Sequence, residues 1–282
     1  MRLMLDPRVQ QSQSREQWQV SGSAPEAYER YMVPTLFSPW AMDLIERMSL
    51  QPGEHVLDVA CGTGIVARLA ARRVNPGGSV TGLDLNPGML LVARSVSPTM
   101  DVELEWREGS AMALPFTNAS FNAVLCQQGL QFFPDRLVAL REMHRVLVPD
   151  GRLGLSVWRP IQQNPYMAAL ANAVDRRVSV DVAAGMRTVC ALGDAEVLRS
   201  LLLDAGFRDV RICIAIQVMR FPSVETFLPG QFAATPFAEA VAALDASART
   251  ALLEDVRSAL LPYTDDTGIA VPNEAHVAVG HT

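Results

Sequence analysis

The chain has 282 residues, 49% of them hydrophobic, which is enough for one large core or for a core with a cap. A formal net charge of −6 disfavours nucleic acid as a partner, and no apolar run approaches the roughly 20 residues of a membrane-spanning helix. Four widely spaced cysteines without a CxxC pair indicate neither a metal site nor disulfides, so we expect a cytoplasmic protein without a metal.

Residues 1–50 are predicted to form an N-terminal arm and a helical lid. The arm, up to about residue 22, is polar and rich in Gln and Ser, and its exchange between two copies would make a homo-oligomer. From residue 25 apolar side chains recur at helical spacing. Pro34 and Pro39 are expected to break this segment into short helices.

Residues 51–159 alternate between strand and helix patterns, which is typical of a parallel, doubly wound sheet. The first strand runs into a glycine-rich turn at 60–64, and a helix follows. A turn of this kind lets a ligand approach the main chain closely, and α/β proteins bind nucleotides there. Asn86 is predicted to cap the helix after the second strand. The further strands are expected at 79–85, 102–106, 121–126 and 152–158.

Beyond residue 159 this alternation stops. Residues 160–192 are predicted to be a helical insert over the site, and residues 193–282 the C-terminal part of the core with a cover segment near 222–263. The expected elements of that last part are a helix at 194–205, a long strand at 210–219 and a short closing strand at 275–279, which together suggest an antiparallel edge. Large apolar side chains of the cover segments predict an apolar pocket: Met32, Phe37, Met167, Met186, Phe227, Phe232 and Phe237.

The glycine-rich turn on its own leaves the nucleotide open. Residues 62–67 match the dinucleotide pattern GxGxxA, and Asp84 stands twenty residues past Gly64, where a ribose-binding acid belongs, so the turn fits NAD. Asp58, however, lies just before the glycines, where it would repel a pyrophosphate and attract a positive amino group. The pattern also does not repeat as two equal mononucleotide halves.

Four stretches, in order, resemble the signatures of class I S-adenosylmethionine-dependent methyltransferases. They read LDVACGTG at 57–64, LDLNPGM at 83–89, EGSAMALPF at 108–116 and RVLVPDGRL at 145–153. The pattern is similar in particular to the small-molecule subgroup that includes the ubiquinone/menaquinone-biosynthesis methyltransferases. The resemblance spans about residues 50–215. It implies a Rossmann-like, doubly wound, mostly parallel seven-stranded α/β sheet with an antiparallel edge strand and a helical lid.

The resemblance also implies a cofactor, S-adenosyl-L-methionine, with S-adenosyl-L-homocysteine as its product. Asp58 and the turn would hold the methionine end, Asp84 would accept both ribose hydroxyls, and Leu85 and Met89 would pack on the adenine. Ser110 stands where the family commonly has Asp, so adenine recognition would rely more on backbone groups. The expected cofactor-binding residues are Asp58, Ala60, Cys61, Gly62, Thr63, Gly64, Asp84, Leu85, Met89, Gly109, Ser110, Ala111, Cys126, Gln127 and Gln128.

The expected reaction is methyl transfer to a small, apolar or aromatic metabolite. Since the sulfonium already activates the methyl carbon, the protein has to align the nucleophile and exclude water. Tyr28 and Tyr31 are the candidate catalytic residues, as groups that orient the acceptor, and Gln131, Trp158 and Tyr166 are expected to line the substrate pocket. The methylated atom is left open. The alternatives are an NAD-linked oxidoreductase and a non-catalytic S-adenosylmethionine-binding partner protein.

Overall fold

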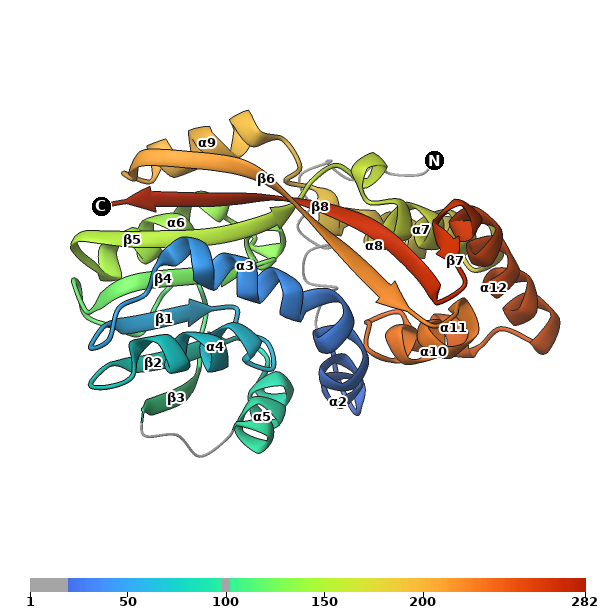
Figure 1. The fold of residues 1–282 in the computed structure, drawn as a ribbon, viewed down its shortest axis with the longest axis horizontal. Coiled ribbons are helices and arrows are strands. Elements are labelled where there is room, and N and C mark those ends of the chain that lie inside the picture. The colour runs from blue at the N-terminus through green and yellow to red at the C-terminus, as the bar shows by residue number, and fades with distance from the viewer. Residues whose placement is uncertain (1–19, 98–101) are drawn as a thin grey trace, which may run out of the picture.

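The computed structural model describes residues 20–97 and 102–282. Most of the predicted N-terminal arm therefore lies outside the described residues. Within them, helices cover both faces of a central sheet, and a helical lobe stands at one end of that sheet (Figure 1). Across residues 20–97 and 102–282, no helix combines the length and apolar character that a bilayer crossing requires.

The sheet has the strand order β3-β2-β1-β4-β5-β8-β6, and a two-residue strand, β7, pairs with β8. β1 to β5 pair in parallel, whereas β8 is antiparallel to both β5 and β6. The predicted mostly parallel sheet with an antiparallel edge is confirmed. The strands are β1 (His55–Val59), β2 (Ser79–Asp84), β3 (Glu103–Glu108), β4 (Phe121–Gln127), β5 (Leu147–Trp158), β6 (Arg208–Phe221), β7 (Thr264–Asp265) and β8 (Gly268–His281).

Five helices cover the sheet, and the remaining helical segments of the described chain build the lid and its connections. The sheet helices are α3 (Ser38–Met48), α4 (Ile65–Val74), α5 (Pro87–Val96), α6 (Arg136–Val146) and α9 (Ala195–Asp204). The others are α2 (Ala24–Ala27), the π-helical η1 (Tyr28–Phe37), η2 (Leu130–Phe132), η3 (Ile161–Gln163), α7 (Pro165–Arg177), α8 (Val180–Arg187), η4 (Thr188–Cys190), α10 (Val224–Ala233), α11 (Ala238–Ala242), α12 (Ala246–Leu260) and η5 (Leu261–Tyr263).

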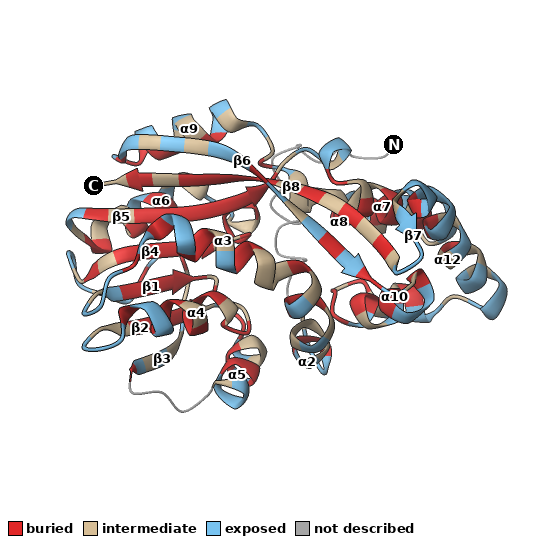
Figure 2. Ribbon diagram, in the orientation of Figure 1, coloured by how far each residue is buried: buried red, intermediate tan, exposed pale blue. Residues whose placement is uncertain are grey.

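The central strands are buried on both faces, as their apolar sequences predict for a parallel sheet (Figure 2). In β1, Val56 packs with residues of α3 and α4, whereas Leu57 and Val59 pack with residues of α6 and α9. Successive side chains of a strand point to opposite faces, so the residues of this one short strand pack against the helices on both faces of the sheet. Because both faces of the sheet are covered, polar groups that bind a ligand are expected at the carboxyl ends of the strands.

The two long strands β6 and β8 carry the lid. β5 pairs with β8 only over residues 275–281, whereas β6 and β8 pair on to Phe221 and Ile269. This extension reaches the lobe of α7, α8, α10, α11 and α12 (Figure 1), where α7 packs on β8 and α12 packs on α7. The prediction of a short closing strand at 275–279 was wrong. The local sequence has low strand propensity because it contains Gly268, Pro272 and Asn273. Pairing with β6 nevertheless extends the strand through these residues.

The N-terminal lid segment is one unbroken helical run, α2–η1–α3. Pro34 lies inside η1, so the predicted break at this proline was wrong. A proline removes one backbone donor, and the wider π-helical stretch is the local adjustment that accompanies it here. Pro39 lies in the first turn of α3, just past the junction with η1, and does not interrupt the run either, so the predicted break at this proline was also wrong.

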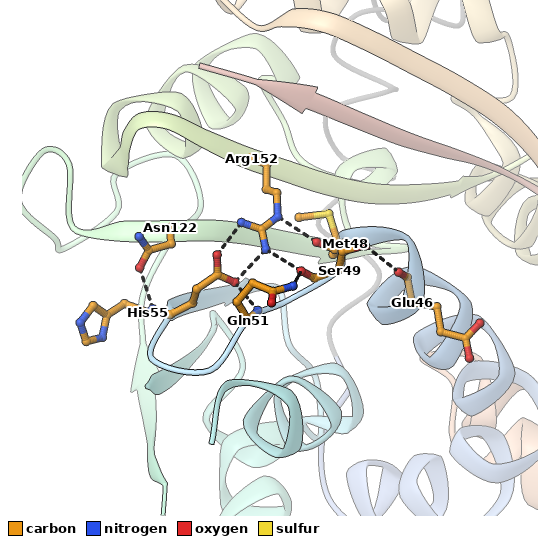
Figure 3. Close-up of polar contacts among 8 residues, drawn as sticks. Glu46, Met48, Ser49, Gln51, His55, Asn122 and Arg152 are labelled. Atoms are coloured by element: carbon orange, nitrogen blue, oxygen red, sulfur yellow. Dashed lines mark hydrogen bonds and ion pairs between the residues drawn. The ribbon is translucent and has the colours of Figure 1, made fainter. Parts of the chain in front are cut away.

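A network of polar contacts holds the chain together at the amino ends of the strands (Figure 3). Both Nη atoms of Arg152 donate to the Glu54 carboxylate at 2.7 Å, and its Nε donates to the Met48 carbonyl at 2.8 Å. The Asn122 side chain accepts from the backbone N–H of His55 at 2.8 Å. This network connects the loop before β1 to the end of α3 and to β5. His55 lies there, at the amino end of β1 and away from the carboxyl ends of the strands.

Candidate active site

A cavity of about 400 Å³ lies where the carboxyl ends of the strands meet the lid. Its sheet-side wall follows β1, β2, β3 and β4 and consists of Ala60, Gly62, Leu83, Asp84, Leu85, Asn86, Met89, Gly109, Ser110, Ala111, Met112, Gln127, Gln128 and Gly129. Its other wall consists of Val20, Tyr28, Met32, Leu36, Phe37, Gln131, Phe132, Phe133, Pro134, Trp158, Tyr166, Met167, Leu170, Met186, Val189, Gln231, Ala234 and Thr235. One cavity therefore joins the glycine-rich turn to the apolar lid.

Asp84 is the carboxylate of this wall. Its Oδ2 accepts from the Gly62 N–H at 2.7 Å, and its Oδ1 accepts from the Asn86 N–H at 2.8 Å. Burial raises the pKa of Asp84, and these backbone hydrogen bonds oppose that rise. Each carboxylate oxygen can accept more than one hydrogen bond, so Asp84 can still receive two hydroxyl groups of a ligand.

Asp58 lies behind the turn rather than on the cavity wall. It is 1% exposed, and its Oδ2 accepts from the Ala67 N–H in the first turn of α4 at 3.0 Å. Burial raises the pKa of Asp58 to about 8. The side chain thus fixes the start of α4 under the turn. The structure does not bring it to the cavity, where a ligand's amino group was expected to meet it.

Four other residues expected at the cofactor also stay off the wall, namely Cys61, Thr63, Gly64 and Cys126. Burial raises the pKa of Cys126 to about 12 and that of Cys61 well above its ordinary value, as for thiols packed in a core. Gly64 has φ +86, and a Cβ there would overlap the Trp106 ring. Cys61, Thr63 and Gly64 belong to the turn and Cys126 to β4; of the turn, Ala60 and Gly62 face the cavity.

The loops after β2 and β3 close the far end of the sheet-side wall. Asn86 caps α5, accepting from the N–H groups of Gly88 at 2.9 Å and Met89 at 3.2 Å, as predicted. The Ser110 hydroxyl accepts from the Met112 N–H at 3.1 Å. The hydroxyl can still donate its O–H, so Ser110 can offer both its side chain and its backbone groups to a ligand.

The two candidate tyrosines of the lid are placed differently. Tyr28 is half-buried on the cavity wall, stacked on Phe37 with ring centroids 5.0 Å apart, and burial of its hydroxyl and the charge of Asp84 raise its pKa. Tyr31 does not line the cavity, and its ring fills the space where a side chain at Gly230 would lie. The expectation that both tyrosines face the acceptor was wrong for Tyr31. In a π-helix, residues four or five apart share a face, as Tyr28 does with Met32.

At the lid end, the three residues expected at the substrate pocket, Gln131, Trp158 and Tyr166, all line the cavity. Trp158 packs edge-on against Trp40 at 5.3 Å, and Tyr166 is fully buried beside Phe221. Of the apolar side chains expected there, the structure brings Met32, Phe37, Met167 and Met186 to the wall, whereas Phe227, Phe232 and Phe237 pack in the core of the lid.

Among the described residues, sequence reasoning missed two polar ones on the lid side of the wall, Thr235 and, on α10, Gln231. The signal for Gln231 was a lone glutamine in the apolar stretch FLPGQFA. Arg68 is 9% exposed, with Nη1 donating to the Thr63 carbonyl and Nη2 donating to Glu29 at 2.9 Å. This ion pair links the lid segment η1 to the glycine-rich turn.

Comparisons with known proteins agree with this geometry. Residues 57–155 match the family described as a methyltransferase domain. The chain is 42% identical over 115 residues to the demethylmenaquinone methyltransferase of Listeria welshimeri, covering 40% of this chain and 49% of that protein. It is 40% identical over 116 residues to the 2-phytyl-1,4-naphtoquinone methyltransferase of Thermosynechococcus vestitus, covering 41% and 51%. The chain thus spans about half the length of the curated relatives it matches.

The fold as a whole is similar to that of phosphoethanolamine N-methyltransferase 2 from Haemonchus contortus, solved in complex with S-adenosyl-L-methionine. The TM-score is 0.56 at 20% identity, and the match covers 91% of this chain and 56% of that one. At this identity the likeness concerns the fold alone. The strand order, the cavity at the carboxyl ends and the match over residues 57–155 together identify this part of the chain as a class I S-adenosylmethionine-dependent methyltransferase domain.

Proposed function

We propose that this protein is an enzyme that transfers the methyl group of S-adenosylmethionine to a small, apolar or aromatic metabolite and releases S-adenosylhomocysteine. The observation that carries the proposal is the single cavity, which runs from Asp84 and the glycine-rich turn to an apolar lid. The two curated relatives reported above are named as quinone methyltransferases, which is consistent with an apolar lid.

The residues of the sheet-side wall fit the cofactor. Asp84 offers two carboxylate oxygens to a ribose diol, and Gly62, which has φ +55 and no side chain, leaves room for a ligand against the turn. Met89 and Ala111 supply an apolar surface for the adenine ring, beside the backbone of Ser110. When bound, S-adenosylmethionine supplies a methyl group that its sulfonium has already activated.

The chain's own contribution is then positioning and exclusion of water. Among the described residues that line the cavity, Asp84 is the only carboxylate and there is no histidine. The raised pKa of Tyr28 keeps its phenol neutral, so it can donate a hydrogen bond but does not act as a base at neutral pH. Proximity and desolvation between the turn and the lid are therefore the means of catalysis.

Calorimetric titration with S-adenosylhomocysteine and with NADH tests the cofactor. We expect one molecule of S-adenosylhomocysteine per chain and no binding of NADH. In Asp84→Asn, which loses a charged acceptor, the affinity for S-adenosylhomocysteine should fall about 10- to 100-fold. Tight binding of NADH without binding of S-adenosylhomocysteine would contradict the proposal and favour an oxidoreductase.

Three further parts of the proposal concern the molecule's surroundings. A small-molecule acceptor rather than nucleic acid follows from the apolar wall and from the net charge of −6. A cytoplasmic location is supported by the four cysteines, all of which are free. A homo-oligomer, and the division of the chain near residues 50, 159 and 192, remain predictions.

A further inference from the structure

The cavity wall contains buried polar groups that have no protein partner. Gln128, Gln131 and Gln231 are 6%, 2% and 6% exposed, and all three line the cavity. Within the described structure, both side-chain polar atoms of Gln128 and of Gln131 make no hydrogen bond, nor does Oε1 of Gln231. The hydroxyl of Tyr166, fully buried in the same cavity wall, makes none either.

These groups come from both sides of the cavity. Gln128 follows β4, and Gln131 lies on η2, whereas Tyr166 is near the start of α7 and Gln231 is on α10. Buried polar groups in proteins are almost always hydrogen-bonded. Five described residues of a single wall carry unpartnered polar atoms, namely these four and Gln127 at the end of β4, which indicates that a ligand supplies the partners.

The backbone of Gln128 supports this interpretation. It has φ +53, a left-handed conformation that a residue with a side chain seldom adopts, and its N–H donates to the Ser156 carbonyl on β5 at 2.9 Å. Such strain persists where the surroundings hold it, and it is concentrated at functional sites. The side chain of Gln128 is thereby held in a fixed direction.

Among the described residues, no charged side chain lines the lid side of the cavity, although Arg136, which is not part of the wall, donates to the backbone carbonyl of Gln131 at 3.3 Å. Of the described residues that line the cavity, Asp84 is the only one with a charged side chain, and it belongs to the cofactor end. Most of the other side chains on the lid side are apolar, with Leu36, Met167 and Leu170 among them. The Thr235 hydroxyl, also on that side, donates to the Phe232 carbonyl at 2.8 Å. A charged acceptor would be buried there without a counter-charge, which is strongly unfavourable.

We propose that Gln128, Gln131, Gln231 and Tyr166 form a neutral clamp that recognises the acceptor by its hydroxyl or carbonyl groups. The clamp selects an uncharged molecule with an apolar body and at least one such group. This inference rests on the proposed function and defines its acceptor more closely. A site that is built to hydrogen-bond a substrate rejects the analogue that lacks the group, because buried polar atoms are then left unpaired.

Equilibrium dialysis in saturating S-adenosylhomocysteine tests the clamp with three probes: 2-naphthol, 2-methylnaphthalene and 2-naphthoate. We expect 2-naphthol to bind about tenfold or more tightly than 2-methylnaphthalene, and 2-naphthoate to bind least. Gln131→Met and Gln231→Met, which keep the length of the side chain, should reduce that preference several-fold and leave the affinity for S-adenosylhomocysteine unchanged. Gln163→Met, at an exposed position on η3, is the matched control and should behave as the wild type.

Thermal unfolding without ligand separates recognition from a structural role. Gln131→Met should keep or raise the Tm, because it removes unpaired polar atoms from the interior, whereas a structural glutamine would lower the Tm when replaced. Equal affinity for 2-naphthol and 2-methylnaphthalene, preference for 2-naphthoate, or no binding of any probe while S-adenosylhomocysteine binds would each overturn the clamp. Failure of S-adenosylhomocysteine itself to bind would instead overturn the proposed function.

Discussion

Asp58 is buried and Asp84 is half-buried, and the two lie on neighbouring strands, yet only Asp84 lines the cavity. The Asp58 carboxylate instead makes its hydrogen bond within the protein, where it accepts from the Ala67 N–H at the start of α4. That position stabilises the helix start but makes ionisation costly, because few groups replace the lost water. We therefore expect neutralising substitutions to have different effects at the two positions, on stability at Asp58 and on ligand binding at Asp84.

Asp58 should make stability depend on pH. Burial raises its pKa from 3.8 to about 8, so between these values the folded protein holds a proton that the unfolded chain releases. The free energy of unfolding should therefore fall as the pH rises through this window. Asp58→Asn cannot ionise, and its Tm should fall less than that of the wild type between about pH 5 and about pH 8. An equal fall in both proteins would contradict this assignment.

Tyr28 and Tyr31 form a matched pair for a test of catalysis. Tyr28 lies on the cavity wall against Gly62, whereas Tyr31 packs at Gly230. If the neutral phenol of Tyr28 helps to position the reacting groups, Tyr28→Phe should lower kcat about tenfold, and Tyr31→Phe should not change it. Initial rates of methyl transfer with the two variants decide the matter. Full kcat in Tyr28→Phe would show that its hydroxyl has no such role.

At the scale of elements, the lid is connected to the turn through an ion pair. Arg68 on α4 joins the Thr63 carbonyl to Glu29 on η1, and the side chains of the pair are only 11% and 20% exposed. Buried pairs are costly to break singly, since the remaining charge stays behind without a partner. The pair should therefore couple the position of the lid to the conformation of the turn.

Replacing one member of this pair should lower both stability and cofactor affinity. We expect Arg68→Met to reduce the free energy of unfolding by about 2 kcal/mol or more, and to weaken the binding of S-adenosylhomocysteine because the turn loses a contact. The control is Arg208→Met, which breaks an exposed pair with Asp150 and should cost less than about 0.5 kcal/mol. Similar losses in denaturant unfolding of the two variants would disprove the coupling.

At the scale of the whole molecule, local sequence patterns predicted the core well. The strand, turn and helix around Gly62 and the capping residue Asn86 follow from short-range rules, and the doubly wound sheet follows from their repetition. The same rules identified the carboxyl ends of the strands as the site. Asp84, at the end of β2, indeed lies on the cavity wall.

What the sequence could not predict depends on contacts between distant segments. The full length of β8 is set by pairing with β6, and the exclusion of Tyr31 from the cavity is set by the π-helical turn of η1. Gln231 reaches the wall only because α10 packs beside η1. Helix and strand propensities contain no information about such packing, so the lid was predicted only as helical and apolar.

The central claim is that one cavity brings the cofactor and an apolar acceptor together for methyl transfer. Its most direct test is incubation of the protein with methyl-labelled S-adenosylmethionine and an extract of the native organism, followed by mass spectrometry. We predict a labelled, uncharged small molecule with an apolar body, in an amount that falls sharply in Asp84→Asn and is unchanged in Tyr31→Phe. Binding of S-adenosylhomocysteine without any labelled product would contradict the claim and indicate a cofactor-binding partner protein instead.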